Sequence, residues 1–82
     1  MDEQNLIDMA NRIGEFFESM PDHEEALAGV ADHIRRFWEP RMRRALLASL
    51  DRPDAGGLQM SAIVKDALLA NRDRLTPAVV VA

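Results

Sequence analysis

The sequence contains no cysteine among its 82 residues. No disulfide can therefore cross-link the chain, and no thiolate is available to bind a metal, hold an iron–sulfur cluster or attack a substrate. A chain of this length forms at most one small domain with a modest core, so we expect marginal stability in isolation. The lack of disulfides also fits a reducing compartment.

Long apolar runs are missing as well, because no stretch approaches the ~20 residues of a membrane span. The first residues, MDEQNLIDM, carry acids where a secretory signal would need positive charge followed by an apolar segment. We therefore expect a soluble, cytoplasmic protein.

Lysine and aromatic residues are scarce: one lysine stands beside nine arginines, and one tryptophan beside three phenylalanines. Five of the arginines lie in RRFWEPRMRR, residues 35–44, together with the tryptophan. Residues 1–34 hold nine acids and one arginine, whereas residues 35–52 hold six arginines and two acids. The remainder is balanced, and the whole chain carries a net charge of -4. Such segregation bears on partner surfaces more than on fold.

Apolar residues recur at helical spacing almost throughout, which predicts an all-α protein. The first helix ends at Pro21, and Asp2 is placed to cap its start. Asp22 begins the second helix, with Glu25 three residues later in the pattern of a capping box. The first apolar stripe is Leu6, Met9, Ala10, Ile13, Phe16, Phe17 and Met20. The second is Leu27, Val30, Ala31, Ile34, Phe37 and Trp38. Gly29 lies inside this stripe, at a cost of ~1 kcal/mol relative to alanine, which is tolerable where another helix crosses closely.

Pro40 breaks the pattern and predicts a corner at Glu39-Pro40, followed by a third helix over roughly residues 40–50. A kinked helix over 22–50 is the alternative. Residues 51–57 form a loop, and a last helix over roughly 61–73 follows, with Ser61 at its start. The stripe of the third helix is Met42, Ala45, Leu46, Leu47 and Leu50, and that of the last is Ile63, Val64, Ala67 and Leu68.

The predicted architecture is a small bundle of three to four short antiparallel helices. We expect residues 1–75 to form one domain. Residues 76–82 form a tail that is flexible or ordered by a partner, because Thr76-Pro77 stops the helix and AVVVA is apolar and β-branched.

Catalysis by this chain alone is disfavoured. His23 and His33 lie ten residues apart, on different helix faces, so they do not pair as metal ligands. Four short helices leave little room for a cleft that would hold an acid–base group. We therefore predict no catalytic, cofactor-binding or metal-binding residue.

Three explanations remain for the arginine cluster. A nucleic-acid site would use the arginines on phosphates and the aromatic pair on a base, but the acidic segment upstream should cancel much of the field. An internal network would pair Asp32 with Arg35 and Arg36, and Glu39 with Arg43. In the first helix it would pair Arg12 with Asp8 and Glu15.

The third explanation is a protein interface, since tryptophan and arginine are enriched at binding hot spots. Arg41 and Arg44 share a face with no acid nearby in sequence, so the internal network does not account for them. Arginine is favoured over lysine where carboxylates are gripped in planar geometry.

Two segments, MANRIGEFFESMPDHEEA (residues 9–26) and ADHIRRFWEPRMRRAL (residues 31–46), resemble the delta subunit of soluble, NAD-dependent, molybdenum-containing formate dehydrogenases. HIRRFWEPRMR, residues 33–43, is the most specific element, and IGEFFE, residues 13–18, supports it. GGLQMSAIVKDAL, residues 56–68, is similar to a later segment of that family.

The resemblance implies a non-catalytic accessory subunit in a cytoplasmic complex that oxidises formate to carbon dioxide and reduces NAD. It implies that an alpha subunit carries a molybdenum bis-guanine-dinucleotide cofactor and iron–sulfur clusters. It implies that beta holds FMN and the NAD site, that gamma holds a further cluster, and that this chain binds none of them.

On this basis we predict docking on the alpha subunit through a surface formed or braced by Arg35, Arg36, Trp38, Arg41, Arg43 and Arg44. Phe37 and part of Trp38 are expected to fill the seam between the second and third helices. The alternative is a free-standing small helical regulator that binds nucleic acid or another protein. The isolated chain is also a candidate for homodimer formation.

Overall fold

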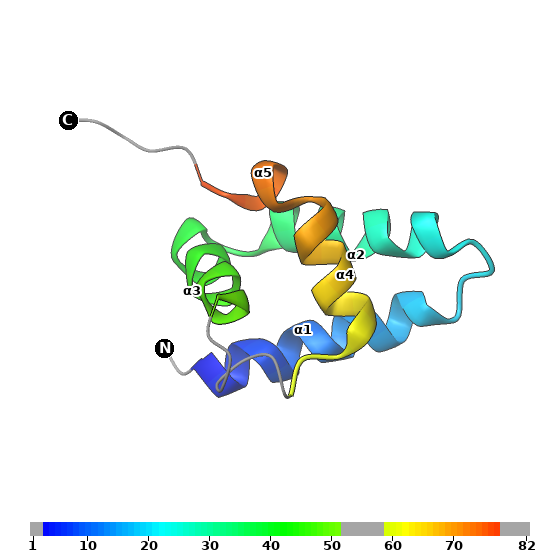
Figure 1. Cartoon of the computed structure of the whole chain (residues 1–82), viewed down its shortest axis with the longest axis horizontal. Helices are drawn as coiled ribbons and strands as arrows, with labels where there is room; N and C mark the ends of the chain where they lie inside the picture. Colours follow the sequence, from blue (N-terminus) through cyan, green and yellow to red (C-terminus); the bar gives the residue numbers. More distant parts are fainter. Residues whose placement is uncertain (1–2, 52–58, 78–82) are drawn as a thin grey trace.

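The computed structural model describes residues 3–51 and 59–77. That part of the chain folds into helices with no strand, which confirms the predicted all-α class. The helices are α1 (Glu3–Glu18), α2 (His23–Phe37), α3 (Pro40–Leu50), α4 (Ala62–Ala70) and α5 (Arg72–Leu75). α1 and α2 run antiparallel, and α3 and α4 cross this pair (Figure 1). None of these helices is long and apolar enough to cross a membrane.

The helix boundaries follow the residues that cap or interrupt helices. Asp22 is the N-cap of α2, where its carboxylate accepts hydrogen bonds from the backbone N–H groups of Glu24, at 2.9 Å, and Glu25, at 3.2 Å. Pro40 occupies the first turn of α3, where its missing N–H leaves no hydrogen bond unmade. The predicted corner at Glu39-Pro40 is confirmed, and the single kinked helix over 22–50 is excluded.

The predicted last helix, 61–73, is divided into α4 and α5 at Asn71. The side-chain amide of Asn71 donates to the Ala67 carbonyl at 3.0 Å, and its backbone leaves helical geometry, with φ −121° and ψ 21°. Asparagine side chains compete with the helix backbone in this way. The Thr76 hydroxyl then bonds the Arg72 carbonyl at 2.7 Å, and Pro77 prevents further helix.

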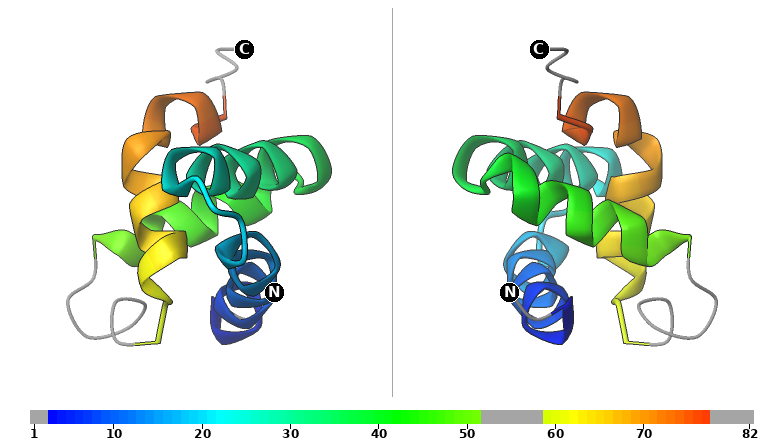
Figure 2. Two further views of the ribbon diagram at one scale, coloured as in Figure 1. Left: turned by 90° about the vertical axis from the view of Figure 1, so that its right-hand side faces the viewer. Right: turned by 90° about the vertical axis from the view of Figure 1, so that its left-hand side faces the viewer.

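The core lies where α4 packs across the antiparallel pair (Figure 2). A side chain on Gly14 would meet Val64 at 2.8 Å, and one on Gly29 would meet the Phe17 ring at 2.5 Å. Both glycines therefore mark close helix crossings, as expected for Gly29. The largest fully buried side chains are Ile7, Val30, Ile34, Leu46, Ser49, Val64, Leu68 and Leu75.

Several predicted core positions on α1 and α2 are exposed instead. Phe16 is 74 % exposed, Phe37 70 % and Met9 43 %, whereas Ile7, outside the predicted stripe, is buried. The expectation that Phe37 fills a seam between the second and third helices is wrong. After the corner α3 packs mainly against α1, so the end of α2 leaves Phe37 uncovered.

Polar side-chain contacts hold the start of α4 and the short helix α5 against the rest of the fold. The Asn11 side chain donates to the Gln59 carbonyl and accepts from the Ser61 N–H, each at 2.8 Å, which holds the start of α4 on α1. Arg72 forms an ion pair with Asp51 at 2.7 Å, which ties α5 to the end of α3. Residues 78–82 of the predicted tail lie outside the described residues.

Candidate interaction surfaces

Four of the predicted docking residues lie exposed around the corner between α2 and α3. Arg35 and Arg36 occupy the last turn of α2, and Arg41 and Arg44 lie on the first turns of α3. We call these four the arginine surface. Pro40 begins α3 directly after the corner, so the corner separates the two pairs along the chain.

Arg43 lies beside this surface but turns inward. It is half-buried, and its Nη1 donates to the Leu75 carbonyl at 3.4 Å, at the end of α5. Its Nε is buried and has no hydrogen-bond partner among the described residues. Arg43 therefore links α3 to α5 and can brace the arginine surface without lying on it.

Trp38 belongs to the core. Its side chain is only 6 % exposed and packs within the main hydrophobic cluster, so it is not on the surface where a partner would meet the chain. Trp38 is the C-cap of α2, with extended backbone angles (φ −93°, ψ 135°). Its burial fixes the point at which the chain turns into α3.

The internal ion-pair network is much smaller than the sequence spacing suggests. Asp32 pairs with Arg36, 3.1 Å apart, and both groups are well exposed. Within residues 3–51 and 59–77 the other predicted pairs, those of Arg35, Arg43 and Arg12, do not form, and Arg41 and Arg44 have no acidic partner. Exposed helix pairs of this kind add only a few tenths of a kcal/mol. Internal pairing therefore leaves most of the cluster unexplained.

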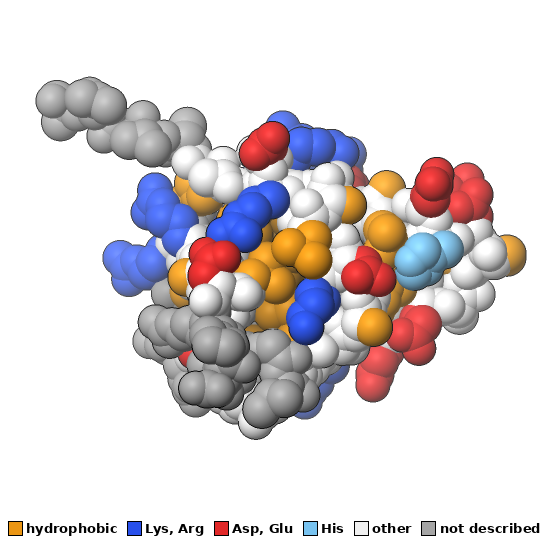
Figure 3. Space-filling view, viewed as in Figure 1, with side chains coloured by type: hydrophobic (Ala, Val, Ile, Leu, Met, Phe, Trp, Pro, Cys, Tyr) orange, Lys and Arg blue, Asp and Glu red, His pale blue; other side chains and the backbone are white. Residues whose placement is uncertain are grey.

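On one face of the molecule, acidic and basic side chains lie toward opposite ends of the antiparallel pair (Figure 3). On the face in Figure 3, red side chains dominate toward the turn between α1 and α2, and blue ones toward α3 and α5. The 15 residues of α2 separate the two ends by ~21 Å, well beyond the ~8 Å Debye length at physiological salt. The acids at the turn therefore weaken the arginine field little, whereas Asp32 of the same acidic segment is paired with Arg36. The expectation for the whole segment stays a prediction.

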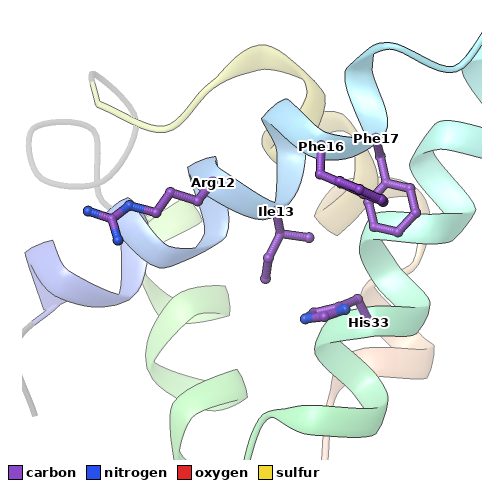
Figure 4. A pocket seen from close by; sticks show the side chains of 5 residues that line it. All are labelled: Arg12, Ile13, Phe16, Phe17 and His33. Carbon is purple, nitrogen blue, oxygen red and sulfur yellow. The ribbon is translucent and has the colours of Figure 1, made fainter.

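A second surface feature was not predicted. A hollow of about 340 Å³ opens between α1 and α2 and is lined by Arg12, Ile13, Phe16, Phe17 and His33 (Figure 4). The Phe16 and Phe17 rings meet edge to face with centroids 5.1 Å apart, and the His33 ring lies 4.8 Å from that of Phe37. The lining is apolar except for the Arg12 and His33 side chains.

The sequence does carry a sign of this hollow. The apolar stripe on α1 includes Phe16 and Met9 as well as the buried Ala10 and Gly14, which spreads it over about half of the helix circumference. A helix that contacts neighbours on one side buries a narrower arc. The excess width indicates an apolar edge with no partner in the described chain.

No described group of three or more His, Asp or Glu side chains is arranged to hold a metal ion. His23 lies at the start of α2 and His33 in its second half beside the hollow. At the Asp51–Arg72 contact each side chain shifts the pKa of the other. The hydrogen bond from Arg72 lowers the pKa of the Asp51 carboxyl, and Asp51 raises the pKa of Arg72.

Comparison with known families gives a match to the NADH-dependent formate dehydrogenase delta subunit FdsD over residues 5–68. No curated protein and no solved structure matches the chain. The matched range contains α2 and α3, most of α1 and α4, the whole arginine surface and the α1–α2 hollow. The match does not favour a free-standing regulator. The chain belongs to the family of NADH-dependent formate dehydrogenase delta subunits.

Proposed function

We propose that this chain is a non-catalytic accessory subunit that docks on the alpha subunit of a formate dehydrogenase through the arginine surface. The carrying observation is that Arg41 and Arg44 are exposed and have no acidic partner among the described residues. Each unpaired guanidinium group is planar and can bind a carboxylate through two hydrogen bonds. The partner surface would therefore be acidic.

Docking would serve assembly or stability through mass action. A partner that binds only the folded chain stabilises it, and a small domain without disulfides gains most from such binding. The same linkage acts in reverse, so the chain would stabilise the conformation of the alpha subunit that it binds. Beta and gamma subunits complete the proposed complex.

The proposal places every cofactor elsewhere in the complex. The chain lacks the cysteines that hold iron–sulfur clusters. Molybdenum bis-guanine-dinucleotide, iron–sulfur clusters, FMN and NAD would be bound by the other subunits, and formate oxidation would take place there. The proposed location is the cytoplasm.

The test is co-purification of the tagged chain with co-expressed alpha, beta and gamma subunits of the same enzyme. We expect Arg41→Glu with Arg44→Glu to abolish co-elution of alpha, because two attractions become repulsions. The matched control is Lys65→Glu with Arg74→Glu, which makes the same change in net charge on α4 and α5. Co-elution should survive in this control.

Circular dichroism of each purified variant separates docking from folding. Both exposed arginines are on the outside of α3, so the double variant should retain its helical signal and unfolding midpoint. Normal co-elution of alpha with the Arg41/Arg44 variant would contradict the proposal. Loss of co-elution in both double variants would mean that net charge, rather than the arginine surface, governs binding.

A further inference from the structure

The half-buried side chain of Arg43 carries an inference of its own, which rests on the proposed function. Its guanidinium group can donate several hydrogen bonds, but within the described chain only Nη1 makes one, to the Leu75 carbonyl at 3.4 Å. Nε is buried and has no hydrogen-bond partner among the described residues. A buried donor without a partner costs free energy, because it has given up its hydrogen bond to water. The contacts of Arg43 in the fold therefore do not account for its position.

The positive charge of Arg43 is unbalanced as well. Arg43 forms no ion pair with any described acid. Glu39, one turn earlier, is the N-cap of α3 and has extended backbone angles (φ −65°, ψ 154°), so the regular helical spacing that pairs residues four apart is not met. Asp51 at the end of α3 is held by Arg72, and Asp73 on α5 is exposed. A half-buried cation without a counter-ion is destabilising.

One edge of the Arg43 guanidinium group is left free. Nη1 is used by the Leu75 carbonyl, and no hydrogen bond of the described chain uses Nε or Nη2. The N–H groups of Nε and Nη2 point the same way in the plane of the group, at a spacing that matches the two oxygens of a carboxylate. This edge therefore fits an Asp or Glu side chain through two parallel hydrogen bonds.

The free edge can be presented to a partner at little cost. The Arg43 side chain is half-buried rather than enclosed, so part of it borders solvent. Its bond to the Leu75 carbonyl is longer than the usual range and therefore weak, so turning the side chain outward gives up little. Arg41 and Arg44, exposed on the same helix, add positive potential that attracts a carboxylate to this region.

We propose that a carboxylate side chain of the formate dehydrogenase alpha subunit binds the Nε and Nη2 edge of Arg43 when the chain docks. Arg43 then exchanges its contact with Leu75 for the partner and adds a fifth arginine to the four of the arginine surface. The exchange gives the unpaired charge a counter-ion and the buried donor an acceptor. Arg43 therefore contributes to affinity without being required for the fold.

Stability and affinity measured on one variant distinguish docking from a role in the fold. Arg43→Met keeps an unbranched side chain but removes the charge and every donor. We expect an unchanged or higher urea midpoint, because an unpaired half-buried cation is lost. We expect the affinity for alpha to fall roughly 10- to 100-fold, as on loss of a charged hydrogen bond. Arg74→Met, at an exposed position of α5, makes the same change in net charge and should leave the affinity at physiological salt unchanged.

Zero-length cross-linking tests the carboxylate itself. Arg43→Lys puts a primary amine at this position, and a carbodiimide joins an amine to a carboxylate only where the two are in contact. Because lysine keeps the charge but cannot bind through two parallel hydrogen bonds, this variant should bind alpha more weakly and still co-elute on co-expression. We expect an amide cross-link to an Asp or Glu of alpha, located by peptide mass spectrometry. Arg74→Lys is the matched control and should give no cross-link to that residue.

The outcomes separate this inference from the proposed function. Full affinity of Arg43→Met overturns the role of Arg43, while docking through the arginine surface stands. A lower urea midpoint, with affinity that recovers after correction for the folded fraction, assigns Arg43 to the fold and also overturns the inference. A cross-link from Arg43→Lys to Glu39 or Asp73, in place of alpha, shows a counter-ion within this chain and overturns the partner carboxylate. Failure of the unmodified chain to co-elute with alpha overturns both proposals.

Discussion

Gly14 and Gly29 lie at two helix crossings whose neighbours differ in their freedom to move. Gly14→Ala places a methyl group within 3 Å of Val64 and Ile63, which are buried and stiff at χ1. Gly29→Ala meets the half-buried Phe17 ring, which can rotate toward the adjacent hollow. Alanine gains helix propensity over glycine, but the crowding costs more. We therefore expect Gly14→Ala to lower the free energy of unfolding by a net amount of about 1–2 kcal/mol.

For Gly29→Ala we expect a change within about 1 kcal/mol, because the gain in helix propensity offsets part of the crowding. Urea unfolding followed by circular dichroism measures both variants. A larger loss for Gly29→Ala than for Gly14→Ala would show that the Phe17 ring is held as firmly as the aliphatic side chains.

The Asp51–Arg72 pair predicts a dependence of stability on pH. In the folded chain the pKa of the Asp51 carboxyl lies below its ordinary value of 3.8. The ion pair therefore stabilises the fold above that value, and this stabilisation is lost as the pH falls through the folded-state pKa. Asp51→Asn should therefore lower the melting temperature at about pH 7 and have no effect well below the folded pKa. Both groups are exposed, so the effect should be small and should shrink in high salt.

The measurement is thermal unfolding of the wild type and Asp51→Asn at several pH values. Asp66→Asn, at an exposed position of α4, controls for the loss of one negative charge. If both variants lower the melting temperature equally at neutral pH, the effect of Asp51→Asn comes from the change in net charge and the ion pair does not stabilise the fold.

At the residue scale, prediction from sequence succeeded where a side chain lies in the middle of an apolar stripe and failed at its edges. Val30, Ile34 and Leu68 were assigned to the core and are fully buried. Phe16 and Phe37 were assigned to it as well and are exposed. Periodicity locates the direction of a stripe, but the position of the neighbouring helix decides how much of its width is covered.

At the element scale, two of the three predicted N-caps, Asp22 and Ser61, lie within the described residues and differ in their hydrogen bonds, while Asp2 lies outside them. Asp22 accepts two backbone N–H groups, whereas the Ser61 hydroxyl makes no capping bond and is buried without a described partner. Asp22→Ala should lower the free energy of unfolding by about 1 kcal/mol. Ser61→Ala should be neutral within about 0.5 kcal/mol, because it removes an unsatisfied hydroxyl rather than a hydrogen bond.

Urea midpoints of the two alanine variants, compared at equal denaturant slope, check this prediction. If Ser61→Ala lowers the free energy of unfolding as much as Asp22→Ala does, the Ser61 hydroxyl caps α4 in solution. Glu24→Ala provides a control for the loss of an exposed acid in the same turn.

Helix ends could be predicted because they depend on local chemistry. Asp22 and Pro40 act within one turn of the boundaries that they set. The packing of α3 against α1 could not be predicted, because it depends on the angle at which the chain leaves the corner. The same angle decides that Arg43 reaches the Leu75 carbonyl instead of Glu39.

At the scale of the whole molecule, the six predicted docking residues fall into an exposed group and an inward-facing group that the sequence could not separate. Four arginines lie exposed, whereas Arg43 turns toward α5 and Trp38 closes the core. The six residues were predicted to form or brace one docking surface, since arginine and tryptophan are enriched at binding hot spots and the residues lie together in the sequence. Helical geometry distributes neighbouring residues around the axis, so adjacency alone does not place them on one surface.

This division predicts opposite behaviour for two sets of variants. Trp38→Phe shrinks a buried side chain and should lower the free energy of unfolding by about 1–3 kcal/mol. Its affinity for the alpha subunit, corrected for the folded fraction, should equal that of the wild type. Arg41→Glu with Arg44→Glu should keep the stability and lose the affinity. Urea unfolding of the isolated chain and titration binding to alpha at fixed salt give the two quantities separately.

The correction for the folded fraction makes the Trp38 result decisive. If only the folded chain binds, the apparent dissociation constant rises in inverse proportion to the fraction folded. An affinity loss beyond that factor would mean that Trp38 contacts the partner directly, which requires the end of α2 to open on docking. If the loss of affinity disappears once the folded fraction is taken into account, Trp38 acts only on folding. The exposed arginines then remain as the proposed docking contacts.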